Sequence, residues 1–133
     1  MLKDFRFHHI GIAVFNIEDS ASIYTNAGYE KTIPVFDPIQ NVYICFLEKE
    51  GMPRIELLAP HDHTSPIYNI LQKNGPIPYH CCYEVDCIES AVVELRAQKF
   101  VPTSKAVSAV AFGGRKVCFL FNKNVGLIEL LET

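Results

Sequence analysis

The sequence predicts an α+β fold of two tandem βαβββ units whose curled sheets pair around a shared cleft. One observation is a repeat of residues 7–18 at 78–89 with a constant offset of 71 positions. Another is the motif "IELL" at 55–58, which recurs at 128–131 with an offset of 73. These offsets exceed the roughly 20–50-residue periods of solenoid repeats, so they indicate one duplicated unit. The matched positions of the longer repeat include His9/His80, Val14/Val85, Ile17/Ile88 and Glu18/Glu89.

The first unit, over about residues 5–60, begins with a half-buried strand in "HHIGIAV". Asn16, with Asp19 three residues later, can cap the start of a helix. One apolar face of this helix carries residues at helical spacing, and Gly28 is placed to end it. The face residues are Ile17, Ala21 and Tyr24, and the strands predicted to follow are 29–35, 41–48 and 54–60.

The second unit, over about residues 78–132, repeats this order after a connection at 61–77. In the connection, Ser65 is expected to cap a short helix, Pro66 to occupy its first turn and Gly75 to end it. Asp86 with Glu89 suggests a second helix cap. The predicted strands are 80–85, 100–107, 115–121 and 126–132, and the helix face is Ile88, Val92 and Leu95. We expect both units to form a single domain over residues 1–133.

Composition excludes several classes of protein. The formal net charge of −3 gives no basic field for nucleic acid. No apolar run approaches the roughly 20 residues of a membrane helix, and the N-terminus lacks the apolar core of a secretory signal. We therefore expect a cytoplasmic protein that binds neither nucleic acid nor membrane. The cysteines are expected to be reduced, since their number, five, is odd. A zinc site in "HCCYEVDC" is not expected, because no second Cys/His pair is present to complete the four ligands.

Two symmetric pairs of polar residues could carry chemistry. His9 and Glu56 lie on the first and last predicted strands of their unit, and His80 and Glu129 occupy the equivalent strands of the other. If the units are related by a twofold axis, two imidazoles and two carboxylates converge, which suits a divalent ion such as Zn, Ni, Co, Mn or Fe. Alternatively, each histidine is a hydrogen-bonded core residue, and each glutamate is the polar half of a strand alternation.

Other candidate residues lack this symmetry. His8, His61 and His63 have no counterparts at the repeat offset, so we interpret them as surface residues. The segment "AFGGRKV" at 111–117 is explained by a glycine turn between strands. A loop in which Arg115 and Lys116 face an anionic ligand is also compatible with this segment.

Four segments, taken in order, resemble the vicinal oxygen chelate (glyoxalase / bleomycin resistance / dioxygenase) superfamily. They are "HHIGIAVFNIEDS", "IELLAP" followed by "SPIYNILQKNG", "HCCYEVDCIESAVVEL" and "AFGGRKVCFLFNKNVGLIELLE". The chain looks closest to methylmalonyl-CoA epimerase-like and glyoxalase I-like proteins. The resemblance implies one divalent metal ion bound by His9, Glu56, His80 and Glu129, with Glu129 also moving the proton.

The resemblance also implies an isomerase or lyase, of the acyl-CoA epimerase or lactoylglutathione lyase kind, that acts through a metal-bound enolate. Its substrate would be a small α-oxo, hydroxy-thioester or acyl-CoA compound. Because sheets of this type expose edge strands, we expect a homodimer. The alternative is a non-catalytic protein of the same fold that binds a drug or antibiotic, and retention of all four ligand-type residues disfavours it.

One position departs from the family pattern. The epimerases usually carry a glutamate just before a glutamine as a second acid/base, whereas here Ile39 precedes Gln40. Inversion of a stereocentre needs a base on each face of the enolate. Asp37 is the nearest carboxylate in the sequence, but two residues along an extended chain span roughly 6–7 Å. Asp37 is therefore too far to replace a base at residue 39 without a rearranged loop.

Overall fold

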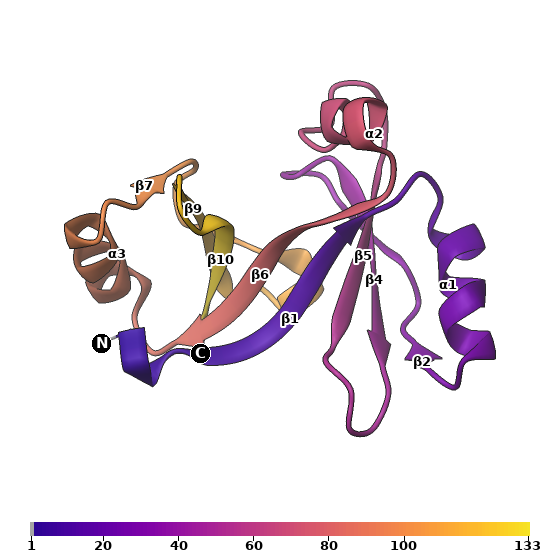
Figure 1. Cartoon of the computed structure of the whole chain (residues 1–133), viewed down its shortest axis with the longest axis horizontal. Coiled ribbons are helices and arrows are strands. Elements are labelled where there is room, and N and C mark those ends of the chain that lie inside the picture. The colour runs from indigo at the N-terminus through magenta and orange to yellow at the C-terminus, as the bar shows by residue number, and fades with distance from the viewer. Residues whose placement is uncertain (1) are drawn as a thin grey trace. The chain divides into compact units, whose positions relative to one another are not determined.

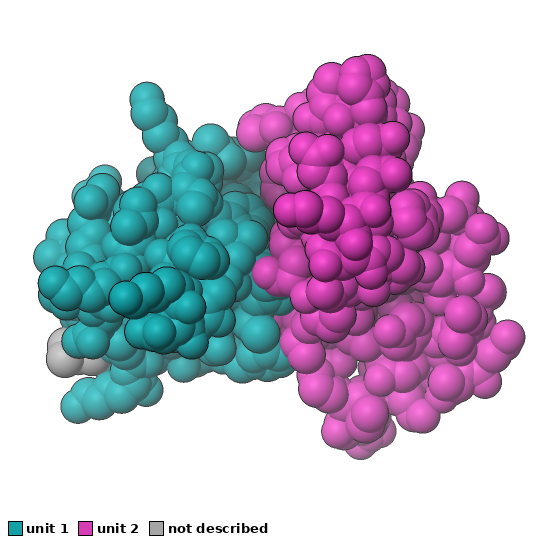
Figure 2. Space-filling model, turned by 45° about the horizontal axis from the view of Figure 1, so that its top comes forward, with its two compact units in different colours: residues 1–8, 80–133 teal, residues 9–79 magenta. Residues whose placement is uncertain are grey.

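The computed structural model describes residues 2–133, and within them ten strands and three α-helices form a mixed α+β structure (Figure 1). Two compact units are distinguished: unit 1 contains residues 2–8 and 80–133, and unit 2 contains residues 9–79 (Figure 2). The predicted α+β class and the tandem βαβββ order are confirmed, while the single domain over 1–133 stays a prediction. The helices are α1 (Ile17–Asn26), α2 (Tyr68–Asn74) and α3 (Ile88–Ala97), with the 3₁₀ turns η1 (Leu2–Asp4) and η2 (Val110–Phe112).

In unit 2 the last strand lies between the first strand and the rest of the sheet. The order is β2-β4-β5-β1, and β3 also pairs with β4. The β1–β5 pair is parallel, whereas the pairs made by β4 are antiparallel. Helix α1 packs on β4 and β5, where its buried face completes a hydrophobic core with Cys45, Leu47 and Leu57. The strands are β1 (Arg6–Ala13), β2 (Glu30–Lys31), β3 (Val35–Asp37), β4 (Val42–Glu48) and β5 (Ile55–Pro60).

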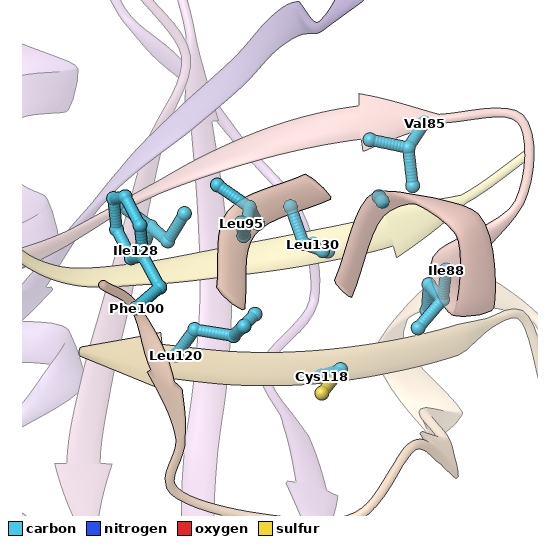
Figure 3. Packing of buried hydrophobic residues seen from close by; sticks show 9 residues of the cluster. Val85, Ile88, Leu95, Phe100, Cys118, Leu120, Ile128 and Leu130 are labelled. Atoms are coloured by element: carbon cyan, nitrogen blue, oxygen red, sulfur yellow. The ribbon is translucent and has the colours of Figure 1, made fainter. Parts of the chain in front are cut away.

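Unit 1 repeats this topology with the order β6-β10-β9-β7, and β8 pairs with β9. Here β6 and β10 are parallel, and β9 is antiparallel to β10. Figure 3 shows its core, in which α3 contributes Ile88 and Leu95 against residues of β9 and β10. The strands are β6 (Ile77–Val85), β7 (Val101–Pro102), β8 (Val107–Ser108), β9 (Lys116–Asn122) and β10 (Gly126–Glu132).

Two predicted strands are each divided in the structure. The segment 29–35 forms the two-residue β2 and the start of β3, and 100–107 forms β7 and the start of β8. Pro34 lies between β2 and β3, and Pro102 ends β7. Proline has no backbone N–H to donate to a ladder, which agrees with the break at Pro34. Pro102 is itself paired with Leu120, and the second break follows it, between Pro102 and Val107.

The two equivalent helices begin differently. On α1, the predicted cap is confirmed, because the Asn16 side chain accepts a hydrogen bond of 2.9 Å from the Asp19 backbone N–H. On α3, the predicted cap is wrong: Cys87, and not Asp86, occupies the cap position, and its side chain makes no capping hydrogen bond. Instead the Ile88 backbone N–H donates to a Glu132 carboxylate oxygen at 2.9 Å. The acceptor therefore comes from a strand 44 residues away, which local sequence cannot show.

The connecting helix α2 begins at Tyr68, later than Ser65 and Pro66 predicted. The Ser65 side chain does not cap it. Its backbone carbonyl instead accepts from the Tyr68 N–H at 3.0 Å, in the turn that precedes the helix. The predicted end at Gly75 is confirmed, since its N–H donates to the Leu71 carbonyl at 2.8 Å.

The cysteines are free thiols in three different environments, as expected for a reduced protein. Cys45 and Cys118 occupy equivalent positions in the two cores, and burial raises the pKa of both thiols. Cys82 is also buried, and its neighbour Cys81 is partly exposed. Cys87 is exposed at the start of α3, where hydrogen bonding from Ser90 lowers its pKa.

In the described residues 2–133, no helix has the length and apolar character needed to cross a bilayer.

The residues that follow α1 and α3 suggest a test of local strain. Gly28 and Lys99 are equivalent under the 71-residue offset, and both have positive φ, 94° and 71°. A left-handed backbone costs a residue with a side chain about 1–2 kcal/mol, partly offset by the entropy that glycine loses on folding. We expect Lys99→Gly to raise the free energy of unfolding by about 0.5–1 kcal/mol, measured by urea denaturation.

The matched control is Gly28→Ala. A Cβ at Gly28 would approach only the flexible Lys49 side chain, at 3.5 Å, so the backbone conformation dominates its cost. This variant should lower the free energy of unfolding by about 1 kcal/mol. Destabilisation by Lys99→Gly would contradict the strain at residue 99.

Candidate metal centre

Unit 2 holds a buried histidine–glutamate pair on its two parallel strands. The register places Gly11 of β1 opposite Glu56 of β5, so His9, two residues earlier on β1, lies on the same face as Glu56. The His9 Nε2 and Glu56 Oε1 atoms are 3.2 Å apart. His9 is fully buried and Glu56 is 2% exposed. The interpretation of Glu56 as a solvent-exposed strand residue is therefore excluded.

Unit 1 holds an equivalent pair in an equivalent register. Cys82 of β6 lies opposite Glu129 of β10, and His80 precedes Cys82 by two residues. The His80 Nε2 and Glu129 Oε1 atoms are 3.3 Å apart, and both side chains are buried. Within each unit, the structure thus brings together the histidine and glutamate that the repeat predicted as partners.

A phenylalanine ring accompanies each pair. Phe46 of β4 pairs with Glu56, and its ring lies edge-on to His9 with centroids 5.7 Å apart. Phe119 of β9 pairs with Glu129, and its ring lies edge-on to His80 at 5.4 Å. Sequence analysis missed both rings, although they are related by the same 73-residue offset as the glutamates. The rings restrict the orientation of the imidazoles and make their surroundings apolar.

The atoms of each pair have the spacing of neighbouring metal ligands. Ligand atoms about 2.0–2.2 Å from an ion lie roughly 3.0–3.5 Å apart at octahedral or tetrahedral angles. A charge-assisted N–H···O bond is shorter, about 2.7–2.9 Å. The observed separations of 3.2 and 3.3 Å fit the first range. A divalent cation would also offset the cost of burying the carboxylate of each pair.

The segment that departs from the family pattern forms a turn held by Asp37. One carboxylate oxygen of Asp37 accepts from the backbone N–H groups of Ile39 at 2.9 Å and Gln40 at 3.1 Å. The other accepts from the Gln40 side-chain amide at 3.1 Å. Asp37 is 2% exposed, and Ile39 is 62% exposed. The Asp37 carboxylate therefore stabilises the turn, and the Ile39 side chain projects from the turn.

The remaining histidines lie outside the pairs. His61 and His63 are exposed, as predicted, and His61 Nδ1 is 3.1 Å from the Tyr43 hydroxyl. His8 is half-buried, so its interpretation as a surface residue is wrong: its ring packs edge-on to Phe112 with centroids 5.6 Å apart.

The segment 111–117 forms the predicted turn, in which η2 leads through Gly113 and Gly114 into β9. Arg115 is held within unit 1. Its guanidinium donates to the Glu132 carbonyl at 2.8 Å and to the Glu84 carboxylate at 2.6 Å. The bond from Arg115 lowers the pKa of Glu84. These contacts assign Arg115 to the structure of the unit, which disfavours the interpretation as a ligand-facing loop.

Comparison with known proteins identifies the family. The model of the glyoxalase/bleomycin resistance protein/dioxygenase superfamily matches residues 8–119. The chain belongs to this superfamily. Human mitochondrial methylmalonyl-CoA epimerase is 37% identical over 94% of the chain and 72% of its own length. Ethylmalonyl-CoA/methylmalonyl-CoA epimerase of Cereibacter sphaeroides is 34% identical over 94% and 96%.

A solved structure agrees with the fold. The methylmalonyl-CoA epimerase of Mycobacterium tuberculosis matches with a TM-score of 0.84 and 26% identity. The match covers 96% of this chain and 87% of that structure's chain. The α+β fold predicted from the repeat is thus the fold of this superfamily.

The Asp37 turn gives a prediction about stability. Asp37→Ala removes the acceptor of three hydrogen bonds from a buried position, which should lower the free energy of unfolding by about 2 kcal/mol. Asp37→Asn keeps one oxygen for the backbone donors and should cost less. Both are measured by urea denaturation, with Gln40→Ala as the control that removes only the side-chain bond. Equal stability of all four proteins would show that the turn does not depend on this carboxylate.

Proposed function

We propose that this protein is an acyl-CoA isomerase of the methylmalonyl-CoA epimerase type. The observation that carries the proposal is the buried histidine–glutamate pair, present with the same register in both units. The similarity to two curated epimerases, each over 94% of the chain, supports the substrate class. Retention of both pairs, buried and with ligand spacing, favours an enzyme over a binding protein of the same superfamily.

The proposal includes one divalent metal ion held jointly by His9, Glu56, His80 and Glu129. Each pair offers two ligand atoms, whereas catalytic sites for such ions use about three or more protein ligands. One pair alone is therefore insufficient, and the duplication supplies the others. When bound, the ion would stabilise negative charge that develops on a substrate carbonyl oxygen.

Glu129 is proposed as the group that moves the proton. The bond between the α-carbon and its hydrogen breaks, the proton passes to the Glu129 carboxylate, and the electron pair moves into the thioester carbonyl to form an enolate. Return of a proton to the opposite face of the same carbon would complete an inversion. Phe119, edge-on to His80, contributes by restricting the orientation of the imidazole beside this carboxylate.

The turn at residues 37–40 limits the stereochemistry of proton return. Ile39 has no ionisable group, and the nearby Asp37 carboxylate already accepts three hydrogen bonds within the turn. A proton taken and returned by Glu129 alone restores the original configuration. We therefore propose that exchange of the α-proton with solvent is faster than inversion.

The metal proposal predicts the effect of each histidine. Purified protein should hold about one equivalent of a divalent transition ion, and His9→Ala or His80→Ala should each remove most of it. Metal content is measured by mass spectrometry after dialysis, with circular dichroism to verify the fold. His63→Ala, an exposed histidine outside both pairs, is the matched control and should retain the ion. Full metal content in either pair variant would refute the joint site.

The proton-transfer proposal predicts a separation of two rates. With methylmalonyl-CoA in D₂O, NMR should show α-deuterium incorporation faster than inversion. Glu129→Gln should slow the exchange by roughly 10²–10⁴-fold. Because Glu129 is also a proposed ligand, the metal content of this variant must equal that of the unmodified protein for the comparison to hold.

Ile39→Glu tests the missing second base. The side chain at this position is exposed, so the substitution should leave the fold intact and raise the ratio of inversion to exchange. Ile39→Gln, of nearly the same size but without a base, is the control and should leave that ratio unchanged. Inversion by the unmodified protein at the rate of exchange would show that another residue supplies the second base.

The predicted homodimer and cytoplasmic location are further parts of the proposal. Within unit 2, the strand β3 pairs with β4, and Val35 and Phe36 are both exposed on it. Such exposed apolar residues on an outlying strand support association of two chains. Sedimentation equilibrium would measure the mass of the particle.

A further inference from the structure

An apolar hollow of about 510 Å³ lies in unit 1, on the side of the sheet that α3 covers. Its lining includes Leu95, Phe100 and Ile128, which belong to the core cluster of Figure 3, together with Tyr83. Phe5 and Val125 also line it. Volumes of this size are typical of small-molecule sites. The hollow is formed by residues other than the histidine–glutamate pairs.

The equivalent region of unit 2 shows what the hollow lacks. Under the 71-residue offset, Leu95 corresponds to Tyr24 and Phe100 corresponds to Tyr29. In unit 2 the two tyrosine rings pack edge-to-face, with centroids 5.4 Å apart and planes at 85°. Unit 1 keeps the second ring, in Phe100, but has a leucine where unit 2 places the first. One phenol ring is therefore absent from the unit 1 version of this packing.

A second difference between the units lies at Asn122, which lines the hollow. In unit 2 the Lys49 ammonium donates to the Ala27 carbonyl at 2.7 Å, and it lies 5.7 Å from the centroid of the Tyr29 ring. Under the 73-residue offset the equivalent residue is Asn122, whose amide donates to the Gln98 carbonyl at 3.0 Å. The hydrogen bond to the end of the helix is thus conserved between the units. The asparagine side chain, which lines the hollow, is shorter than the lysine side chain of unit 2.

The lining determines the charge of a ligand. Among the described residues that line the hollow, none is Asp, Glu, Lys, Arg or His. Burial raises the pKa of Tyr83, so this phenol stays neutral at physiological pH. A charged ligand would lose hydration without gaining an ionic partner, whereas an uncharged ring would gain contacts with the rings of Phe100 and Tyr83. The exposed amides of Gln98 and Asn124 can bond to one hydroxyl at the rim.

We propose that this hollow is a binding site for an uncharged, phenol-sized aromatic molecule, which takes the place that Tyr24 occupies in unit 2. The site is separate from the proposed acyl-CoA chemistry and does not depend on it.

The probe is 4-methylphenol, which is the tyrosine side chain as a free molecule. At about 1–10 mM, the range expected for so small a ligand, it should shift the NMR methyl signals of Leu95, Val125 and Ile128 in a saturable manner. The anion 4-methylbenzoate has a similar shape and should bind at least about tenfold more weakly. Equal binding of both compounds, or no saturable shift of these signals, would overturn the proposal.

Reciprocal substitutions locate the site. Leu95→Tyr supplies the missing ring and should abolish the binding of 4-methylphenol. Tyr24→Leu removes the ring from unit 2 and should add a second site, seen as new saturable shifts of signals around Tyr29. Circular dichroism verifies that each variant is folded. If Leu95→Tyr does not fold, Val125→Trp at the exposed rim should block the hollow instead. Unchanged binding in the folded blocking variant would also overturn the proposal.

Discussion

The parallel pairing of the first strand with the last strand in each unit is the constraint on which the candidate site depends. A hairpin would join neighbouring strands antiparallel, whereas here a helix and the intervening strands separate β1 from β5 and β6 from β10. The register then sets Glu56 opposite Gly11, and Glu129 opposite Cys82. Since side chains alternate along a strand, a shift of one residue would turn each glutamate away from its histidine. The proposed chemistry thus rests on backbone register.

Much of this organisation could be predicted because the sequence contains the same unit twice. The repeat related His9 to His80 and Glu56 to Glu129, and it gave the correct order of strands and helices in both units. The broken strands around Pro34 and Pro102 were predicted as continuous because their apolar pattern continues through the prolines. At Pro34 the missing backbone donor prevailed over side-chain patterning, whereas Pro102 remains paired with Leu120 and the strand ends after it.

Other features could not be predicted, since they depend on contacts between residues distant in the chain. The helix cap that Glu132 gives to α3 joins residues 44 positions apart, and local capping rules pointed to Asp86 instead. The rings of Phe46 and Phe119 became relevant only when the strand pairing placed them beside the histidines. The role of Asp37 likewise could not be predicted without the path of the backbone. Its proximity to Ile39 in the sequence suggested a catalytic base, whereas in the structure its carboxylate accepts hydrogen bonds within the turn.

The distribution of thiols affects how samples of this protein behave on storage. Cys45 and Cys118 are inside the two cores, where the thiolate form is disfavoured, so oxidants reach them slowly. Cys87 is exposed, and its lowered pKa makes the reactive thiolate more abundant. In aerated buffer, we therefore expect Cys87 to oxidise first, and one expected product is a disulfide between two chains. Such a product has the mass of a dimer without a dimer interface, so measurements of assembly require a reductant or a Cys87→Ser chain.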